Sequence, residues 1–187
     1  MTDERSIEVD SADEYNGVQC VFCTTGSEGA IAEELNRMDG VTAIVAKKQK
    51  KEWRSGAWCE VRKVLLPGYV FLYRHSALLT PVVNARLQSM CVLKYNDGNT
   101  LLIGKDRQFA DWLWKQGGVI GISTARHCGS DVEITGGPLA ELDGIITRID
   151  RRKQIAKVTL EIAGGLSVWM SFDYTDAGSC QDAQAST

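Results

Sequence analysis

The alternation of apolar and polar residues is clearest between residues 131 and 175, where it predicts several short strands. Apolar side chains occupy every second position in residues 155–162 and again in residues 166–172. Between these runs, Gly164 and Gly165 suit a tight hairpin turn. Residues 131–135 and 144–150 predict two further strands. Because a small open sheet would leave its edges unpaired, we expect residues 131–175 to form a small all-β barrel that folds by itself.

Helical and strand patterns alternate between residues 17 and 118. Strands are predicted at residues 18–23, 41–46, 64–72 and 91–95, and helices begin near Ser27, Pro81 and Asp106. Pro67 and Gly68 interrupt the third strand, which predicts a bend there. Residues 47–63 are polar with Ser-Gly at their middle, so they predict a long protruding hairpin. We therefore expect an α/β (α+β) sandwich, in which helices flank a central and mainly antiparallel sheet.

The patterns give the expected domain organisation. Residues 1–16 are acidic and without periodicity, so we interpret them as a disordered tail. Residues 17–118 form the expected first domain, residues 119–130 a linker, residues 131–175 the barrel, and residues 176–187 a second tail. The chain has no run of eighteen apolar residues and no secretory signal, so a cytoplasmic protein is expected.

Charge is distributed unevenly along the chain, whose formal net charge is −3. Residues 1–16 hold one arginine against six acidic residues, whereas residues 47–63 hold seven cations against two acidic residues. Basic patches are therefore possible on an acidic protein. A second cationic run, Arg151, Arg152 and Lys153, occupies a turn between two predicted strands, with Arg148 and Lys157 on the flanking strands. These five residues suit a ridge that contacts nucleic-acid phosphates, or a solvated turn.

The sequence offers little for catalysis or metal binding. Cys20 and Cys23 are three apart in a predicted strand, where their side chains would face opposite sides and could not hold one ion. Neither His75 nor His127 stands beside a nucleophile with an orienting acid, and no phosphate-cradling glycine loop follows a strand. We expect no enzyme, no cofactor and no metal.

Three segments carry a resemblance to a known family. The run GPLAELDGIITRIDRRKQIAKVTLEIAG is similar to the KOW domain of NusG-type transcription elongation factors, and its Ile-Asp-Arg-Arg-Lys turn is most like LoaP, a specialised antitermination branch of that family. The segments LLPGYVFL and CTTGSEGAIAEEL resemble the N-terminal (NGN) domain of the same family. One departure is that Val18 and Gln19 stand where the family has Trp-Tyr.

The resemblance implies a monomeric transcription factor with two binding surfaces. In the first domain, a pocket would receive the clamp helices of the largest RNA polymerase subunit; its residues here are Phe22, Leu66, Tyr69 and Phe71. The hairpin, with Lys50, Lys51 and Arg54 among its cations and Trp53 and Trp58 between them, would lie near upstream or non-template DNA. The barrel would bind a nascent structured RNA through its cationic turn, and Trp169 could stack on a base.

Two alternatives remain open. The protein could be a general elongation factor of the same family, whose barrel binds a ribosomal protein or the helicase Rho. It could instead be a simple RNA-binding module such as a ribosomal protein. A residue pattern with an apolar pocket around Tyr69, rather than cations, favours a polymerase partner over that last class.

Overall fold

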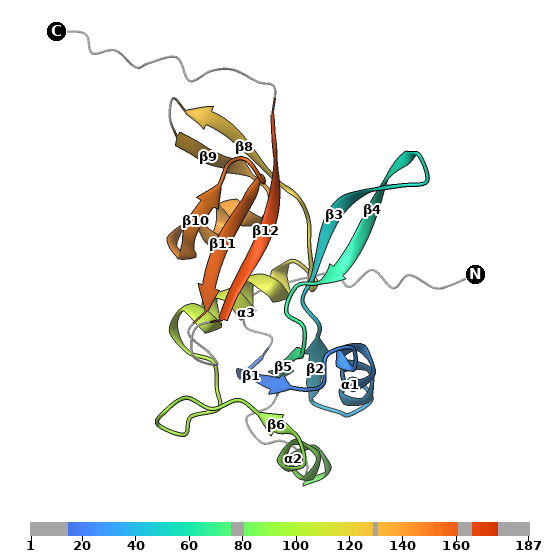
Figure 1. Cartoon of the computed structure of the whole chain (residues 1–187). Helices are drawn as coiled ribbons and strands as arrows, with labels where there is room; N and C mark the ends of the chain where they lie inside the picture. The colour runs from blue at the N-terminus through green and yellow to red at the C-terminus, as the bar shows by residue number, and fades with distance from the viewer. Residues whose placement is uncertain (1–14, 76–80, 129–130, 161–165, 176–187) are drawn as a thin grey trace, which may run out of the picture.

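The computed structural model describes residues 15–75, 81–128, 131–160 and 166–175. These residues contain more strand than helix and form three sheets, so the expected sandwich of one central sheet with flanking helices is wrong. The reason is that only part of the chain joins the first sheet. The hairpin protrudes as predicted and pairs with a short strand from later in the chain, and the strands after residue 122 build a third sheet (Figure 1). The expected tails, residues 1–16 and 176–187, lie almost wholly outside the described residues.

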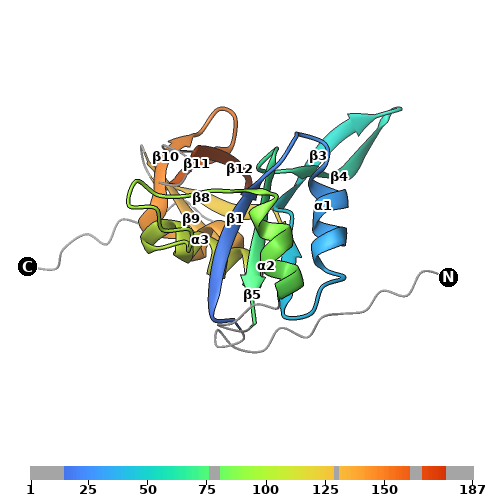
Figure 2. The same ribbon diagram turned by 90° about the horizontal axis from the view of Figure 1, so that it is seen from below.

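The first sheet contains four antiparallel strands in the order β2-β5-β1-β6. Its elements are β1 (Gly17–Phe22), α1 (Glu28–Leu35), β2 (Val41–Ile44), β5 (Tyr69–Arg74), α2 (Pro81–Gln88) and β6 (Cys91–Val92). Helices α1 and α2 lie on one face of this sheet (Figure 2). Leu35 of α1 and Val83 of α2 pack there against Val21, Val70 and Leu72.

The hairpin forms a second sheet with a short strand from later in the chain. β3 (Lys47–Arg54) and β4 (Ala57–Val64) pair along their whole length, and β7 (Val119–Ile120) adds to β3 in parallel. Pro67 and Gly68 lie in a turn before β5, and not inside a strand as predicted. The turn follows because proline cannot donate to a ladder and Gly68 has a φ of 86°.

The third sheet, here called the C-terminal sheet, has the order β10-β11-β12-β8-β9. Its elements are β8 (Ser123–Cys128), β9 (Asp131–Gly136), the 3-10 segment η1 (Pro138–Ile145), β10 (Ile146–Asp150), β11 (Ile155–Leu160) and β12 (Leu166–Tyr174). Among the described residues β10 and β9 lie at its two ends, so the strands form an open curved sheet rather than the expected closed barrel. The predicted inward positions of β11 and β12 are confirmed, since Ala156, Val158, Val168, Met170 and Phe172 are buried.

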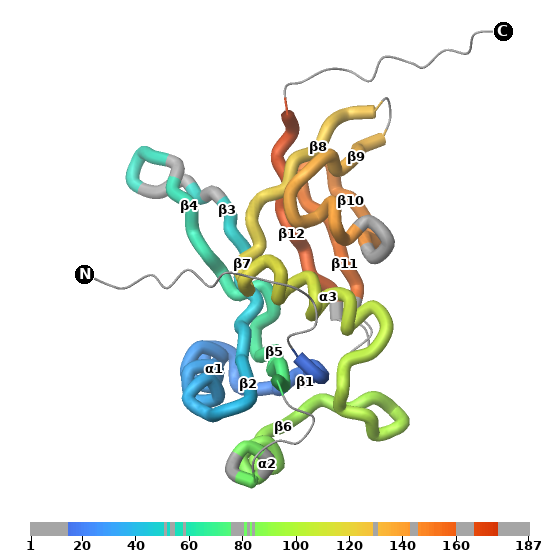
Figure 3. The backbone as a smooth tube through the Cα atoms, turned by 180° about the vertical axis from the view of Figure 1, so that it is seen from behind, coloured from blue at the N-terminus to red at the C-terminus, as the bar shows by residue number. Residues whose placement is uncertain are grey.

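Helix α3 (Gly104–Lys115) lies between the first sheet and the C-terminal sheet (Figures 1 and 3). Its Phe109 packs on Phe71 of β5, with ring centroids 5.8 Å apart. Its Trp112 donates from Nε1 to the carbonyl oxygen of Pro138, 2.9 Å away. One hydrophobic core therefore runs from the first sheet through α3 into the C-terminal sheet. The range predicted as a linker, residues 119–130, contains β7 and β8.

Candidate functional site

An aromatic pair stands on the surface of the first sheet. Phe22 at the end of β1 is in register with Tyr69 at the start of β5, and their rings meet edge to face with centroids 5.4 Å apart. The Phe22 side chain is 47% exposed, and Tyr69 is half-buried. An exposed phenylalanine supported by a tyrosine is the kind of feature that anchors a protein interface. We call Phe22 and Tyr69 the aromatic patch.

Glu28 holds the backbone beneath the aromatic patch. Its buried carboxylate accepts from the backbone N–H of Gly68 at 2.6 Å and of Gly26 at 2.8 Å. The bond from Gly68 is the main cause of a Glu28 pKa below its ordinary value. A side chain at Gly68 would come within 3.0 Å of the Cys23 carbonyl oxygen and 3.2 Å of the Phe22 ring. Only glycine therefore lets this turn support the Phe22 ring so closely.

The other two residues predicted for the polymerase pocket lie in the core. Leu66 and Phe71 are each only 2% exposed, and both belong to the hydrophobic core that α3 covers. Tyr69 and Phe71 are two residues apart and lie on the same side of β5, as expected. Helix α3 covers that side at Phe71. Sequence alternation cannot reveal which part of a strand face a later helix covers. Of the four predicted residues, Phe22 and Tyr69 are the ones that a partner can reach.

The hairpin cations divide between two faces. Lys48 lies opposite Lys63, and Lys50 opposite Val61, so these three lysines share one face. On that face Glu52 bonds both Lys50 at 2.5 Å and Lys63 at 2.6 Å. The side chains of Lys51, Arg54, Trp53 and Trp58 lie outside what the structure describes.

Lys48 fastens this face of the hairpin to the C-terminal sheet. Its Nζ donates to the Trp169 carbonyl oxygen of β12 at 2.9 Å. Burial, and then the charges of Lys50 and Lys63, lower the pKa of Lys48. Three neighbouring lysines therefore repel one another where the hairpin meets β12.

A row of side chains crosses the outer face of the C-terminal sheet. Arg148 of β10 is in register with Lys157 of β11, which is in register with Trp169 of β12. Directly opposed like charges destabilise a sheet, so a folding role does not explain Arg148 beside Lys157. Two cations and an indole in line suit phosphates and a stacked base. All three residues were predicted from the sequence as nucleic-acid contacts, and the register of the strands aligns them.

The cationic turn between β10 and β11 has a constrained backbone. The Asp150 carboxylate accepts from the Lys153 N–H at 3.0 Å, and Gln154 adopts a φ of 53°, a left-handed conformation uncommon outside glycine. Arg151 pairs with Asp131 of β9 at 3.1 Å. Arg152 and Lys153 are exposed. The sequence offered no signal for Gln154, because glutamine is not a residue that marks left-handed turns.

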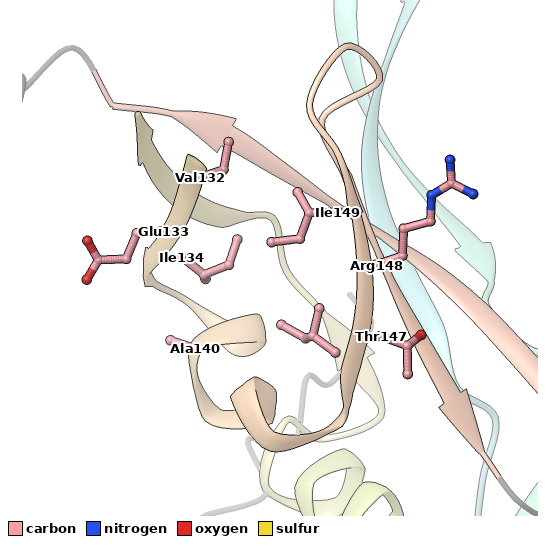
Figure 4. A pocket seen from close by; sticks show the side chains of 8 residues that line it. Val132, Glu133, Ile134, Ala140, Thr147, Arg148 and Ile149 are labelled. Carbon is pink, nitrogen blue, oxygen red and sulfur yellow. The ribbon is translucent and has the colours of Figure 1, made fainter. Parts of the chain in front are cut away.

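The inner side of the C-terminal sheet holds an apolar recess between its two end strands. Val132 and Ile134 of β9 and Ile149 of β10 point into a cavity of about 490 Å³, whereas Arg148 points away from it (Figure 4). Ile146 also lines this cavity. Strict alternation predicted Ile146 and Ile149 on opposite faces; a register shift between Ile146 and Arg148 brings both inward.

No described helix has the length and apolar content needed to cross a membrane. In the part of the chain that the structure describes, no group of His, Cys, Asp and Glu side chains is arranged to hold a metal ion. A comparison with models of protein families finds no match, and a comparison with curated proteins finds none either.

Proposed function

We propose that this chain is a transcription elongation and antitermination factor that binds RNA polymerase through the aromatic patch and a nascent structured RNA through the outer face of the C-terminal sheet. The observation that carries the proposal is the row Arg148, Lys157 and Trp169, with the exposed cations of the neighbouring turn. The likeness of three sequence segments to NusG-type factors supports it further.

The RNA contacts divide into two kinds. Arg148, Arg152, Lys153 and Lys157 present ammonium and guanidinium groups that suit phosphate oxygens and fix the position of an RNA without reading its sequence. Trp169 offers a ring on which an unpaired base can stack. An RNA hairpin with a bulge or loop provides both features, whereas a regular duplex provides only the phosphates.

The polymerase contact rests on Phe22 and Tyr69. Both are large, and their rings support each other at 5.4 Å, so a partner helix would meet a preformed apolar surface. Ordering these side chains on binding would cost little, because strand register and the Glu28 carboxylate already hold them.

A titration of the full chain with leader hairpins from its own operon tests the RNA half of the proposal. We expect binding that weakens with salt, and a loss when Arg148, Arg152 and Lys157 become alanine. Affinity that is absent for every leader hairpin would overturn this half. Capture of RNA polymerase by wild type but not by Tyr69→Ala tests the other half.

The apolar recess of Val132, Ile134, Ile146 and Ile149 favours a second candidate, a general elongation factor whose C-terminal sheet binds a protein. Substitution of Ile134 by serine separates the two functions, because Ile134 lies on the inner side of the sheet, away from the cationic row. Loss of a protein partner with unchanged RNA affinity would favour this second candidate.

A further inference from the structure

Lys50 of the hairpin and Lys153 of the cationic turn lie 103 positions apart in the sequence, yet they line one groove. Lys50 of β3 and Lys153 and Gln154 of the turn share a cavity of about 610 Å³ with Ser171 and Asp173 of β12. Ile122 and Phe172 also line the groove, and the Phe172 side chain itself is fully buried in the core. The two basic segments were predicted as separate surfaces, and the fold brings them to one place.

The position of the groove is fixed on both sides. On the hairpin side, the bond from Lys48 Nζ to the Trp169 carbonyl oxygen holds β3 against β12. On the turn side, the Phe172 N–H donates to the Gln154 carbonyl oxygen at 3.0 Å. The walls therefore keep their spacing without a ligand, as in a preformed binding site.

The charges around the groove favour an anion. Lys50 and Lys153 line the groove, and Lys48 and Lys63 share the hairpin face of Lys50. Among the residues that line the groove, Asp173 is the carboxylate, and Asp150 bonds the Lys153 backbone beside it. Glu52 already bonds two of these lysines. An added phosphate would lessen the repulsion among the lysines.

The polar groups of the groove suit a nucleotide backbone. The Gln154 amide and the Ser171 hydroxyl can donate to a phosphate or bond a ribose hydroxyl. Gln154 keeps its left-handed backbone although glycine or asparagine would adopt it at lower cost, and such strain concentrates at binding sites. A recess of about 610 Å³ has the size of a small-ligand site, so a short piece of a single strand fits it.

We infer that the groove between β3 and the β10–β11 turn holds the phosphates of a single-stranded RNA segment that flanks the structured RNA on the outer face of the C-terminal sheet. This inference rests on the proposed function and adds a path to it. Ser171 and Trp169 lie on the same side of β12, so a strand leaving Trp169 reaches the groove directly. The hairpin and the C-terminal sheet then bind the same RNA molecule.

The test compares two RNA probes on the full chain: a leader hairpin with blunt ends, and the same hairpin with a single-stranded extension of about 12 uridylates. We expect the extension to raise affinity in wild type. Lys50→Ala and Lys153→Ala should each reduce the affinity gained from the extension by about threefold to tenfold. Each should also lower the slope of log affinity against log salt concentration by about 0.7. Gln154→Gly should reduce the gain without weakening the fold, because glycine accepts the left-handed backbone.

Lys47→Ala and Arg62→Ala are the matched controls, since both side chains are exposed and lie on the other face of the hairpin. They should leave the gain from the extension nearly unchanged. If Lys50→Ala reduces the gain from the extension no more than Lys47→Ala does, the groove is not the binding site of the extension. Replacing the extension by thymidylates shows whether the groove requires RNA, and equal gains from both extensions would overturn its assignment to RNA.

The two possible failures are distinguishable. If wild type binds the blunt hairpin and Arg148→Ala weakens that binding, the proposed function stands whatever the groove does. If wild type then gains nothing from the extension, the inference alone fails. If wild type binds neither probe, both the proposed function and the inference fail.

Discussion

At the scale of single residues, the burial of each side chain separates binding groups from folding groups. Phe22, Leu66, Tyr69 and Phe71 are similar in a sequence pattern, but their exposures differ widely. The same contrast applies to acidic residues on α1, where Glu28 is buried beneath a turn and Glu33 is exposed.

Tyr69→Ala should mainly weaken polymerase binding, whereas Phe71→Ala should mainly lower the stability of the fold. Tyr69→Ala should cost about 2 kcal/mol or more of polymerase binding, because it truncates an interface aromatic, with a small change in melting temperature. Phe71→Ala should lower the free energy of unfolding by about 3–5 kcal/mol, because it leaves a cavity beneath α3. Thermal unfolding and polymerase affinity of both variants check this. A Tyr69→Ala protein that melts as early as Phe71→Ala would contradict the assignment of Tyr69 to a binding surface.

Glu28→Gln should destabilise the protein by about 1–2 kcal/mol at neutral pH, because it weakens two hydrogen bonds to a carboxylate. The Glu28 pKa is lower in the folded state than its ordinary value of 4.5. The charged Glu28 carboxylate therefore stabilises the fold at pH values above 4.5. This contribution disappears as the pH falls through the folded-state pKa.

Urea unfolding at neutral and acidic pH measures the effect. The difference between wild type and Glu28→Gln should narrow as the pH falls below 4.5. Glu33→Gln, on the exposed side of the same helix, is the control and should differ little from wild type at either pH. A difference that stays constant with pH would show that the Glu28 charge is not involved.

At the scale of elements, strand register decides which charges meet. Arg148 opposes Lys157 across β10 and β11, whereas Arg126 opposes Glu133 across β8 and β9 and bonds it at 2.8 Å. The first pair costs stability and the second adds to it. The opposed Arg148 and Lys157 lower the stability of the sheet, and residues that lower stability in this way are often binding residues.

Arg148→Glu should therefore raise the free energy of unfolding by a few tenths to about 1 kcal/mol while reducing RNA affinity, because it replaces repulsion by attraction and removes a phosphate contact. Arg126→Glu is the matched charge reversal and should lower stability instead. Chemical unfolding and RNA titration of both variants provide the measurement. Lower stability in both variants would count against the repulsion between Arg148 and Lys157.

At the scale of the whole molecule, α3 joins the two parts of the chain into one core. Phe109 contacts the first sheet, and Trp112 bonds the backbone beside η1 of the C-terminal sheet. β8 lies between β12 and β9, so the sheet needs residues that precede position 131. The structure therefore argues against the sequence-based expectation that residues 131–175 fold alone.

A fragment of residues 131–175 should remain unfolded, because it lacks β8 and so leaves β12 and β9 unpaired along that side. A fragment of residues 119–175 should gain structure relative to it. Proton NMR dispersion distinguishes the two fragments. Full dispersion in the shorter one would mean that β8 and the α3 interface are dispensable.

The full chain should unfold in one transition in calorimetry, because one hydrophobic core contains residues of both parts. Trp112→Phe should shift that transition to lower temperature without splitting it, since it removes the bond to Pro138 and keeps most of the packing. Two separate transitions in wild type would contradict a shared core.

The sequence by itself determined local structure. Alternation identified β11 and β12 and their buried faces, because period-two burial is a property of the strand itself. Helix signals located α1, α2 and α3 for the same local reason, although α3 begins at Gly104 and the buried Asp106 lies within its first turn.

The tertiary structure alone decided how these elements meet. It paired the hairpin with β7, placed α3 over Phe71, inserted β8 into the C-terminal sheet, and shifted the register at Ile146. It also brought Lys50 beside Lys153. Each of these depends on contacts between residues far apart in the chain, which no local pattern encodes.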